Sequence, residues 1–128
     1  MRTDIVLKRD AVLINTTRNT KIASEARLCS SILSKAKGLM FSKKLDDEAL
    51  IFDFNNERLI SLHMLFVFFP IDVVLLDENK KVVELKEKLR PFTFYASKSK
   101  ARYVIETASG KIRETGTKLG DKLGFQLY

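Results

Sequence analysis

The sequence contains few of the residues that build redox, metal or turn-rich proteins. Its 128 residues include one cysteine, one histidine, two prolines, five glycines and no tryptophan. A single cysteine forms no internal disulfide, which agrees with a reducing compartment. Because 45% of the residues are hydrophobic and 30% are charged, the composition is typical of a folded globular protein and not of a disordered or fibrous one.

Segments that target a protein to a membrane or anchor it there are also missing. The N-terminus has no uninterrupted apolar segment of signal-peptide length. The longest apolar run is much shorter than the roughly 20 residues that span a bilayer. We therefore expect a cytoplasmic protein that does not enter the membrane, and at this length a single domain over residues 1–128.

Charge is unbalanced, with a net value of +7 at pH 7. Such a balance favours anionic partners or simply keeps a protein in solution. The basic residues form small clusters that acidic residues interrupt, which favours a solvated surface over a nucleic-acid footprint. The chain has no P-loop, dinucleotide fingerprint, zinc-ligand spacing, nucleophile elbow or pair of catalytic carboxylates. We expect no cofactor and no metal, and we favour a non-catalytic protein.

The longest apolar run lies within residues 59–77, together with the only histidine, His63, and an aspartate between apolar neighbours, Asp72. Aromatic and β-branched residues dominate this stretch and suit a buried, pleated surface. From residue 62 to residue 69 only His63 is polar, which indicates a strand covered on both faces. Since Pro70 has no N–H to donate, we place a break there, between two consecutive core strands.

The rest of the chain alternates short apolar segments with polar turns. We expect strands at residues 5–7, 11–15, 21–28, 49–54, 83–89, 101–108 and 122–127. Polar connections at residues 55–58 and 77–80 predict hairpins, the second with Asn79 at positive φ. Short helices are expected at residues 31–37 and 111–115, each followed by a glycine. These elements predict an α+β domain that is β-rich, with a mostly antiparallel curled sheet or half-open barrel and one or two short helices.

Four motifs in register resemble one known family. They are Gly38-Leu39-Met40, Pro70-Ile71-Asp72, Tyr103-Val104-Ile105-Glu106 and Gly120-Asp121. Over roughly residues 20–125 the chain looks like the family called domain of unknown function 192, in an archaeal-type variant. Many members carry Trp-Met-Lys-Asn-Thr before the proline, where this chain has His63-Met64-Leu65-Phe66-Val67, and an arginine where this chain has Lys35. The family has no established reaction, so the resemblance implies little about activity.

The first candidate site is a ligand-binding set of Asp72, His63 and Lys35. A carboxylate between Ile71 and Val73 is costly to bury without partners, so it either accepts hydrogen bonds at the Pro70 break or faces a ligand. His63 titrates near neutral pH, but a lone histidine makes a poor metal site. This set predicts a non-catalytic domain that binds a small ligand or a protein partner, as a monomer or a homodimer.

Two alternatives stay open. Phe94 and Tyr95, followed by Lys98, Lys100 and Arg102, could stack bases and neutralise phosphates of a single-stranded nucleic acid, or the aromatic rings could merely cap one end of the barrel.

A small enzyme would use Asp72 as general base and His63 as general acid. Cys29 has none of the glycines that usually frame a nucleophile, which favours an inert thiol.

Overall fold

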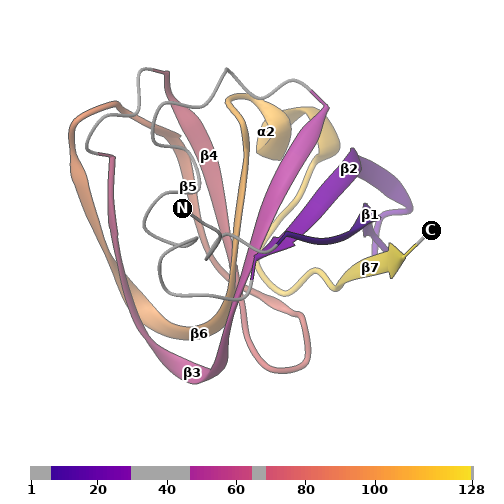
Figure 1. Ribbon diagram of the computed structural model, residues 1–128, viewed down its shortest axis with the longest axis horizontal. Coiled ribbons are helices and arrows are strands. Elements are labelled where there is room, and N and C mark those ends of the chain that lie inside the picture. Colours follow the sequence, from indigo (N-terminus) through magenta and orange to yellow (C-terminus); the bar gives the residue numbers. More distant parts are fainter. Residues whose placement is uncertain (1–6, 30–46, 65–68, 128) are drawn as a thin grey trace.

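The structure, a computed structural model, describes residues 7–29, 47–64 and 69–127. In these segments seven strands form one mixed sheet in the order β5-β4-β6-β3-β2-β1-β7 (Figure 1). The strands are β1 (Leu7–Asn15), β2 (Thr20–Cys29), β3 (Glu48–His63), β4 (Ile71–Leu76), β5 (Val82–Leu89), β6 (Phe94–Ala108) and β7 (Leu123–Leu127), and the described helix is α2 (Lys111–Thr115).

Five of the six neighbouring strand pairs are antiparallel, and β2 with β3 is the parallel one. The expectation of a β-rich, mostly antiparallel sheet is therefore confirmed, while helix makes only a small contribution in the described segments. The sheet is not closed. In the described segments an isolated bridge between Lys81 and Lys122 and a few backbone hydrogen bonds around it connect the start of β5 to the start of β7, at the two ends of the sheet.

The two longest strands, β3 and β6, form a ribbon that bends sharply at the bottom of the view in Figure 1. The second half of β3 pairs with the first half of β6 on the left of that view, away from β1, β2 and β7. We call this distal part, residues 58–63 of β3 with 94–101 of β6, the outer ribbon. Side chains alternate between exposed and partly buried in the first half of β6, whereas residues 103–107 are buried on both faces of the sheet.

Apolar side chains pack into two clusters, one on each face of the sheet. The inner cluster contains Phe52, Val73 and Val104, and the other contains Ile51, Val74 and Ile105. Successive residues of one strand point to opposite faces, so β3, β4 and β6 supply both clusters. Fully burying a side chain of this size contributes about 1.5–3 kcal/mol, and these three strands therefore dominate the stability of the fold.

The turn between β4 and β5 and the short helix α2 match the expectations from sequence. The β4–β5 hairpin is held by Asp77 Oδ1, which accepts hydrogen bonds from the N–H groups of Asn79 (2.8 Å) and Lys81 (2.9 Å). The residue with positive φ is Lys80, at 63°, and not Asn79 as predicted. Helix α2 ends at Gly116, whose φ of 70° is the left-handed conformation that glycine adopts without strain.

The predicted hairpin at residues 55–58 is wrong, because β3 continues through it. Four residues of β3 lie between Asp53 and Arg58, opposite a single residue of β6. This bulge includes Asn55 at a φ of 72°, and its N–H donates to Asp53 Oδ1 at 2.7 Å. Polar residues of this kind usually form a turn. In β3 they form a bulge within one long strand, because β6 pairs with β3 on both sides of them.

Other boundaries also differ from the expectations. The separate strands predicted at residues 5–7 and 11–15 are one strand within the described chain, β1, which includes the charged residues between them and pairs with both β2 and β7. Of the strand predicted over residues 62–69, the part described as strand ends at His63, with Met64 outside it, and β4 starts after Pro70, at the predicted break. Residues 65–68 and the helix predicted at residues 31–37 lie outside the described residues.

Candidate functional site

Asp72, the leading candidate from the sequence, is fully buried on β4 and serves as an anchor. Its Oδ1 accepts a hydrogen bond from the Lys88 N–H (2.9 Å), and its Oδ2 accepts from the N–H groups of Gly110 (3.0 Å) and Ile112 (2.9 Å). These donors belong to the end of β5 and to the start of α2, so one carboxylate ties both segments to the sheet. Three backbone donors satisfy the hydrogen-bonding capacity of the buried carboxyl group.

The proposed partners of Asp72 are not seen beside it. Lys35 lies outside the described residues, and His63 is described only as the last residue of β3, without its side chain. In the strand register His63 pairs with Phe94 at the start of β6, whereas Asp72 pairs with Thr107 near its end. The role of Asp72 and His63 in ligand binding or catalysis stays a prediction. Cys29 ends β2, and its side chain also lies outside the described part.

Glu106 is a buried carboxylate that the sequence analysis did not single out. It is 8% exposed and lies on β6 between Leu50 of β3 and Val73 of β4, two residues of the inner cluster. Its carboxylate forms no hydrogen bond or ion pair with any described residue. Burial raises the pKa of Glu106 to about 8, so the group is largely protonated at neutral pH. The sequence signal that could have identified Glu106 was its place at the end of Tyr103-Val104-Ile105-Glu106, where a carboxyl group follows apolar residues within a strand.

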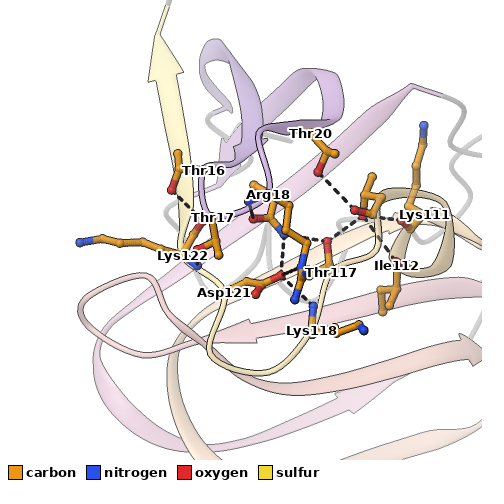
Figure 2. Close-up of polar contacts among 12 residues, drawn as sticks. Thr16, Thr17, Arg18, Thr20, Lys111, Ile112, Thr117, Lys118, Asp121 and Lys122 are labelled. Atoms are coloured by element: carbon orange, nitrogen blue, oxygen red, sulfur yellow. Dashed lines mark hydrogen bonds and ion pairs between the residues drawn. The ribbon is translucent and has the colours of Figure 1, made fainter.

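Asp121 is the centre of a second polar cluster, shown in Figure 2. Its Oδ2 accepts hydrogen bonds from Asn15 Nδ2 (2.9 Å), Arg18 Nε (2.6 Å) and the Lys118 N–H (2.9 Å). Burial acts to raise the pKa of Asp121, but the hydrogen bonds from Arg18 and Asn15 outweigh it and hold the pKa below its usual value. Asn15 Nδ2 also donates to Thr117 Oγ1 at 3.2 Å. The cluster joins the β1–β2 turn to the loop before β7, which is a structural role.

The outer ribbon exposes a face with aromatic, aliphatic and cationic side chains. We call it the outer face. Its members alternate with inward residues and are Leu59, Ser61, Phe94, Ala96, Lys98 and Lys100. Phe94 is 81% exposed and Leu59 is 61% exposed, which is unusual for side chains of this size. Neither Lys98 nor Lys100 forms an ion pair with any described residue, although Lys98 is near enough to Glu84 for its charge to help lower the pKa of that carboxyl group.

A β-bulge in β6 carries Lys98. Leu59 pairs with Lys100 but Ser61 pairs with Ala96, so β6 has two more residues than β3 over this interval. Ser97 Oγ bridges the gap: it accepts from the Ile60 N–H and donates to the Ser99 carbonyl, each at 2.8 Å. Bulges change the direction in which neighbouring side chains point, so this one sets how the two lysines are presented.

Glu84 of β5 fixes the bulge from the inner side. Its Oε1 accepts from the N–H groups of Lys98 (2.9 Å) and Ser99 (2.8 Å), and its Oε2 accepts from the Tyr95 hydroxyl. Burial opposes ionisation of Glu84, yet these donors lower its pKa below the usual value. Burial and the adjacent Glu84 carboxylate raise the pKa of Tyr95 to about 12. The backbone that carries Lys98 is thereby held by a charged acceptor.

Arg102 differs from the two lysines because it is paired. Its Nε and Nη2 donate to the two carboxylate oxygens of Asp53, at 2.9 and 3.1 Å, and its guanidinium lies 5.0 Å from the Tyr103 ring centre. The hydrogen bonds to Asp53 raise the pKa of Arg102 further above its usual value. The structure thus brings Phe94, Lys98 and Lys100 together on one face, with Tyr95 turned inward and Arg102 already neutralised. Nucleic-acid binding by these residues stays a prediction.

Metal and membrane sites were sought in the same segments. No group of three or more histidine, cysteine, aspartate or glutamate side chains suited to a metal ion occurs in residues 7–29, 47–64 and 69–127. No helix in that part of the chain has the length and apolar character needed to cross a membrane.

One bent mixed sheet with buried carboxylate anchors defines a small β-rich domain, and comparison with known proteins places it in a family. The chain belongs to the DUF192 family, described as Uncharacterized ACR, COG1430, whose sequence profile matches residues 13–125. It is 32% identical to a UPF0127 protein of Thermococcus sibiricus over 91% of this chain and 75% of the relative. It is also 32% identical to the UPF0127 protein PH1112 of Pyrococcus horikoshii, over 88% of this chain and 96% of that protein. The expected family, in its archaeal-type variant, is confirmed.

Solved structures share the fold at lower sequence identity. A candidate transcription regulator from Sinorhizobium meliloti 1021 superposes with a TM-score of 0.82 at 20% identity, over 98% of both chains. A protein of unknown function from Novosphingobium aromaticivorans superposes with a TM-score of 0.78 at 23% identity, over 90% of this chain and 83% of that one. At these identities the likeness concerns the fold alone.

Proposed function

We propose that this chain is a non-catalytic binding domain whose partner is anionic and docks on the outer face. The observation that carries the proposal is the anchored bulge of β6. The side chains of Glu84 and Ser97 form four hydrogen bonds with backbone groups of Ile60, Lys98 and Ser99, and the exposed side chain among these three is the cationic one of Lys98. A bulge held in this way presents Lys98 and Lys100 in a fixed geometry, which favours a binding surface over a random solvated one.

Charge supports an anionic partner. The chain carries a net charge of +7, and neither lysine of the outer face forms an ion pair with a described residue, although the charge of Lys98 contributes to lowering the pKa of Glu84. Attraction between exposed charges is weak for a single pair, but several cations that face one polyanion add up and release its counter-ions. Acidic groups near the bend, such as Asp53, are already paired with Arg102 and therefore oppose this attraction less.

Heparin tests this proposal, because it is a polyanion without bases. We expect the double substitution Lys98→Gln and Lys100→Gln to weaken binding at low ionic strength by about tenfold. The matched control removes the same charge at the exposed Lys21 and Lys122, which lie on β2 and before β7, and it should change the affinity much less. Equal losses in both double variants, or no binding of heparin by the unaltered protein, would refute a specific role for the outer face.

A small-ligand site at Asp72, His63 and Lys35 was the first proposal from the sequence, and a cytoplasmic location accompanies it. Support for the site is limited to the burial of Asp72, whose two oxygens are engaged by backbone donors. The outer face has the better support because its charged groups are exposed and without ion-pair partners among the described residues.

A further inference from the structure

We infer that the anionic partner of the outer face is a single-stranded nucleic acid. This inference rests on the proposed function and identifies its partner. The additional observation is the aromatic residue beside the lysines: Phe94 is 81% exposed at the start of β6, and Phe92 in the preceding turn is 56% exposed. Exposed phenylalanine rings are platforms on which unpaired bases stack, whatever their identity.

The order of the residues along β6 suits one nucleic-acid strand. Phe94, Lys98 and Lys100 lie on the same face of one strand. Leu59 of β3, which pairs with Lys100, adds an apolar side chain to this face. Residues two apart in a strand are separated by about 6.6 Å, which is comparable to the separation of successive phosphates in an extended nucleic-acid strand. A backbone that contacts both lysines can therefore place a base on the Phe94 ring without a sharp turn.

Other polyanions fit this face less well. An acidic peptide would pair with Lys98 and Lys100 but would make no specific use of the exposed Phe94 ring. Bases within a duplex are stacked on one another and are not free to stack on a protein ring, so a duplex would also offer only its phosphates. A single strand alone combines closely spaced phosphates with exposed flat bases, and it therefore uses both kinds of side chain.

The experiment compares ligands that differ only in their bases. Fluorescence anisotropy at low salt measures binding of a thymidine oligonucleotide of about 12 nucleotides, within the usual site size of single-strand binders, and of an abasic strand with the same number of phosphates. We expect Phe94→Ala to weaken binding of the thymidine strand by about tenfold and to leave binding of the abasic strand unchanged. Leu119→Ala is the control, because Leu119 is also an exposed apolar residue, at 65%, but lies before β7; it should change neither affinity.

Salt dependence provides a second readout. Two phosphate contacts on a single strand contribute about 1.4 to the slope of log K against log salt concentration. The double substitution Lys98→Gln and Lys100→Gln should reduce the slope by about that amount, while Phe94→Ala should leave the slope unaltered.

The possible outcomes separate this inference from the proposed function. Equal binding of the thymidine and abasic strands, with no effect of Phe94→Ala, overturns the single-strand assignment, and heparin binding that depends on the two lysines would still support an anionic partner. Tighter binding of poly-aspartate or of a duplex than of the thymidine strand also overturns it, in favour of that partner. If neither heparin nor any oligonucleotide binds, both proposals fail.

Discussion

Substituting Glu106 by glutamine should make the stability of this domain much less dependent on pH. Glutamine has the same shape as glutamate but no charge to lose. Glu106 is buried between Leu50 and Val73, and burial raises its pKa from the usual 4.5 to about 8. At low pH both side chains are neutral, and we expect the two proteins to differ by no more than about 1 kcal/mol in their free energies of unfolding.

The sign and size of the effect follow from proton linkage. The folded state holds the Glu106 proton up to a pKa of about 8, whereas the unfolded state releases it near pH 4.5. Between these values the unfolded state binds fewer protons, so stability falls as the pH rises and the loss is complete above the folded pKa. Each pKa unit corresponds to about 1.4 kcal/mol, which makes the total loss about 5 kcal/mol, of which about 4 kcal/mol falls between pH 5 and pH 9. This is a large share of the 5–15 kcal/mol typical of a domain.

Urea unfolding at pH 5, 7 and 9 measures this directly, provided that the dependence on urea concentration is equal in the two proteins. The difference between the unaltered protein and Glu106→Gln cancels contributions from all other titrating groups. We expect the variant to gain about 4 kcal/mol relative to the unaltered protein between pH 5 and pH 9. Glu78→Gln is the control, since Glu78 is exposed in the β4–β5 turn. A constant difference between the unaltered protein and Glu106→Gln at all three pH values would show that Glu106 is not a buried neutral acid.

Two further predictions concern the buried aspartates. Asp72→Ala leaves three backbone N–H groups without an acceptor, so we expect a loss of about 3–5 kcal/mol in urea unfolding, with heparin affinity per folded molecule unchanged; a loss below about 1 kcal/mol would contradict the anchoring role. Asp121→Asn removes the charge that Arg18 pairs with, and we expect a loss of about 2 kcal/mol at pH 7. Because the folded pKa of Asp121 is lowered, this advantage of the aspartate exists above its unfolded pKa of 3.8 and is lost as the pH falls through the folded pKa, so an undiminished difference in strongly acidic solution would argue against it.

Local patterns were sufficient wherever neighbouring residues decide the conformation. The turn at Asp77 depends on a side chain that bonds backbone groups two and four residues on, and the end of α2 depends on a glycine at positive φ. Both are visible in the sequence, and both were predicted. Residues 55–58 have the same polar composition but form a bulge, because β6 pairs with β3 on either side of them. The polar composition of residues 55–58 does favour a turn, but the pairing of β3 with β6 that prevents one cannot be predicted from the local sequence.

The candidate site shows the same division. Phe94, Lys98 and Lys100 were named from their order along the chain, which is a local property. Their support by Glu84 was not predicted, since Glu84 precedes Lys98 by 14 residues and reaches it only because β5 and β6 lie close together. The neutral state of Glu106 was missed for a similar reason: its pKa depends on Leu50 and Val73, which belong to two other strands.

Strand periodicity, turn residues and ordered motifs are properties of consecutive residues, so they were enough to predict a β-rich member of the DUF192 family. Which charges are neutralised and which face the solvent became visible only in the folded sheet. It paired Arg102 with Asp53, buried Asp72 among backbone donors and left Lys98 and Lys100 exposed. The physical reason is that burial and hydrogen bonding depend on partners far away in the chain, whose approach is set by the packing of the whole sheet.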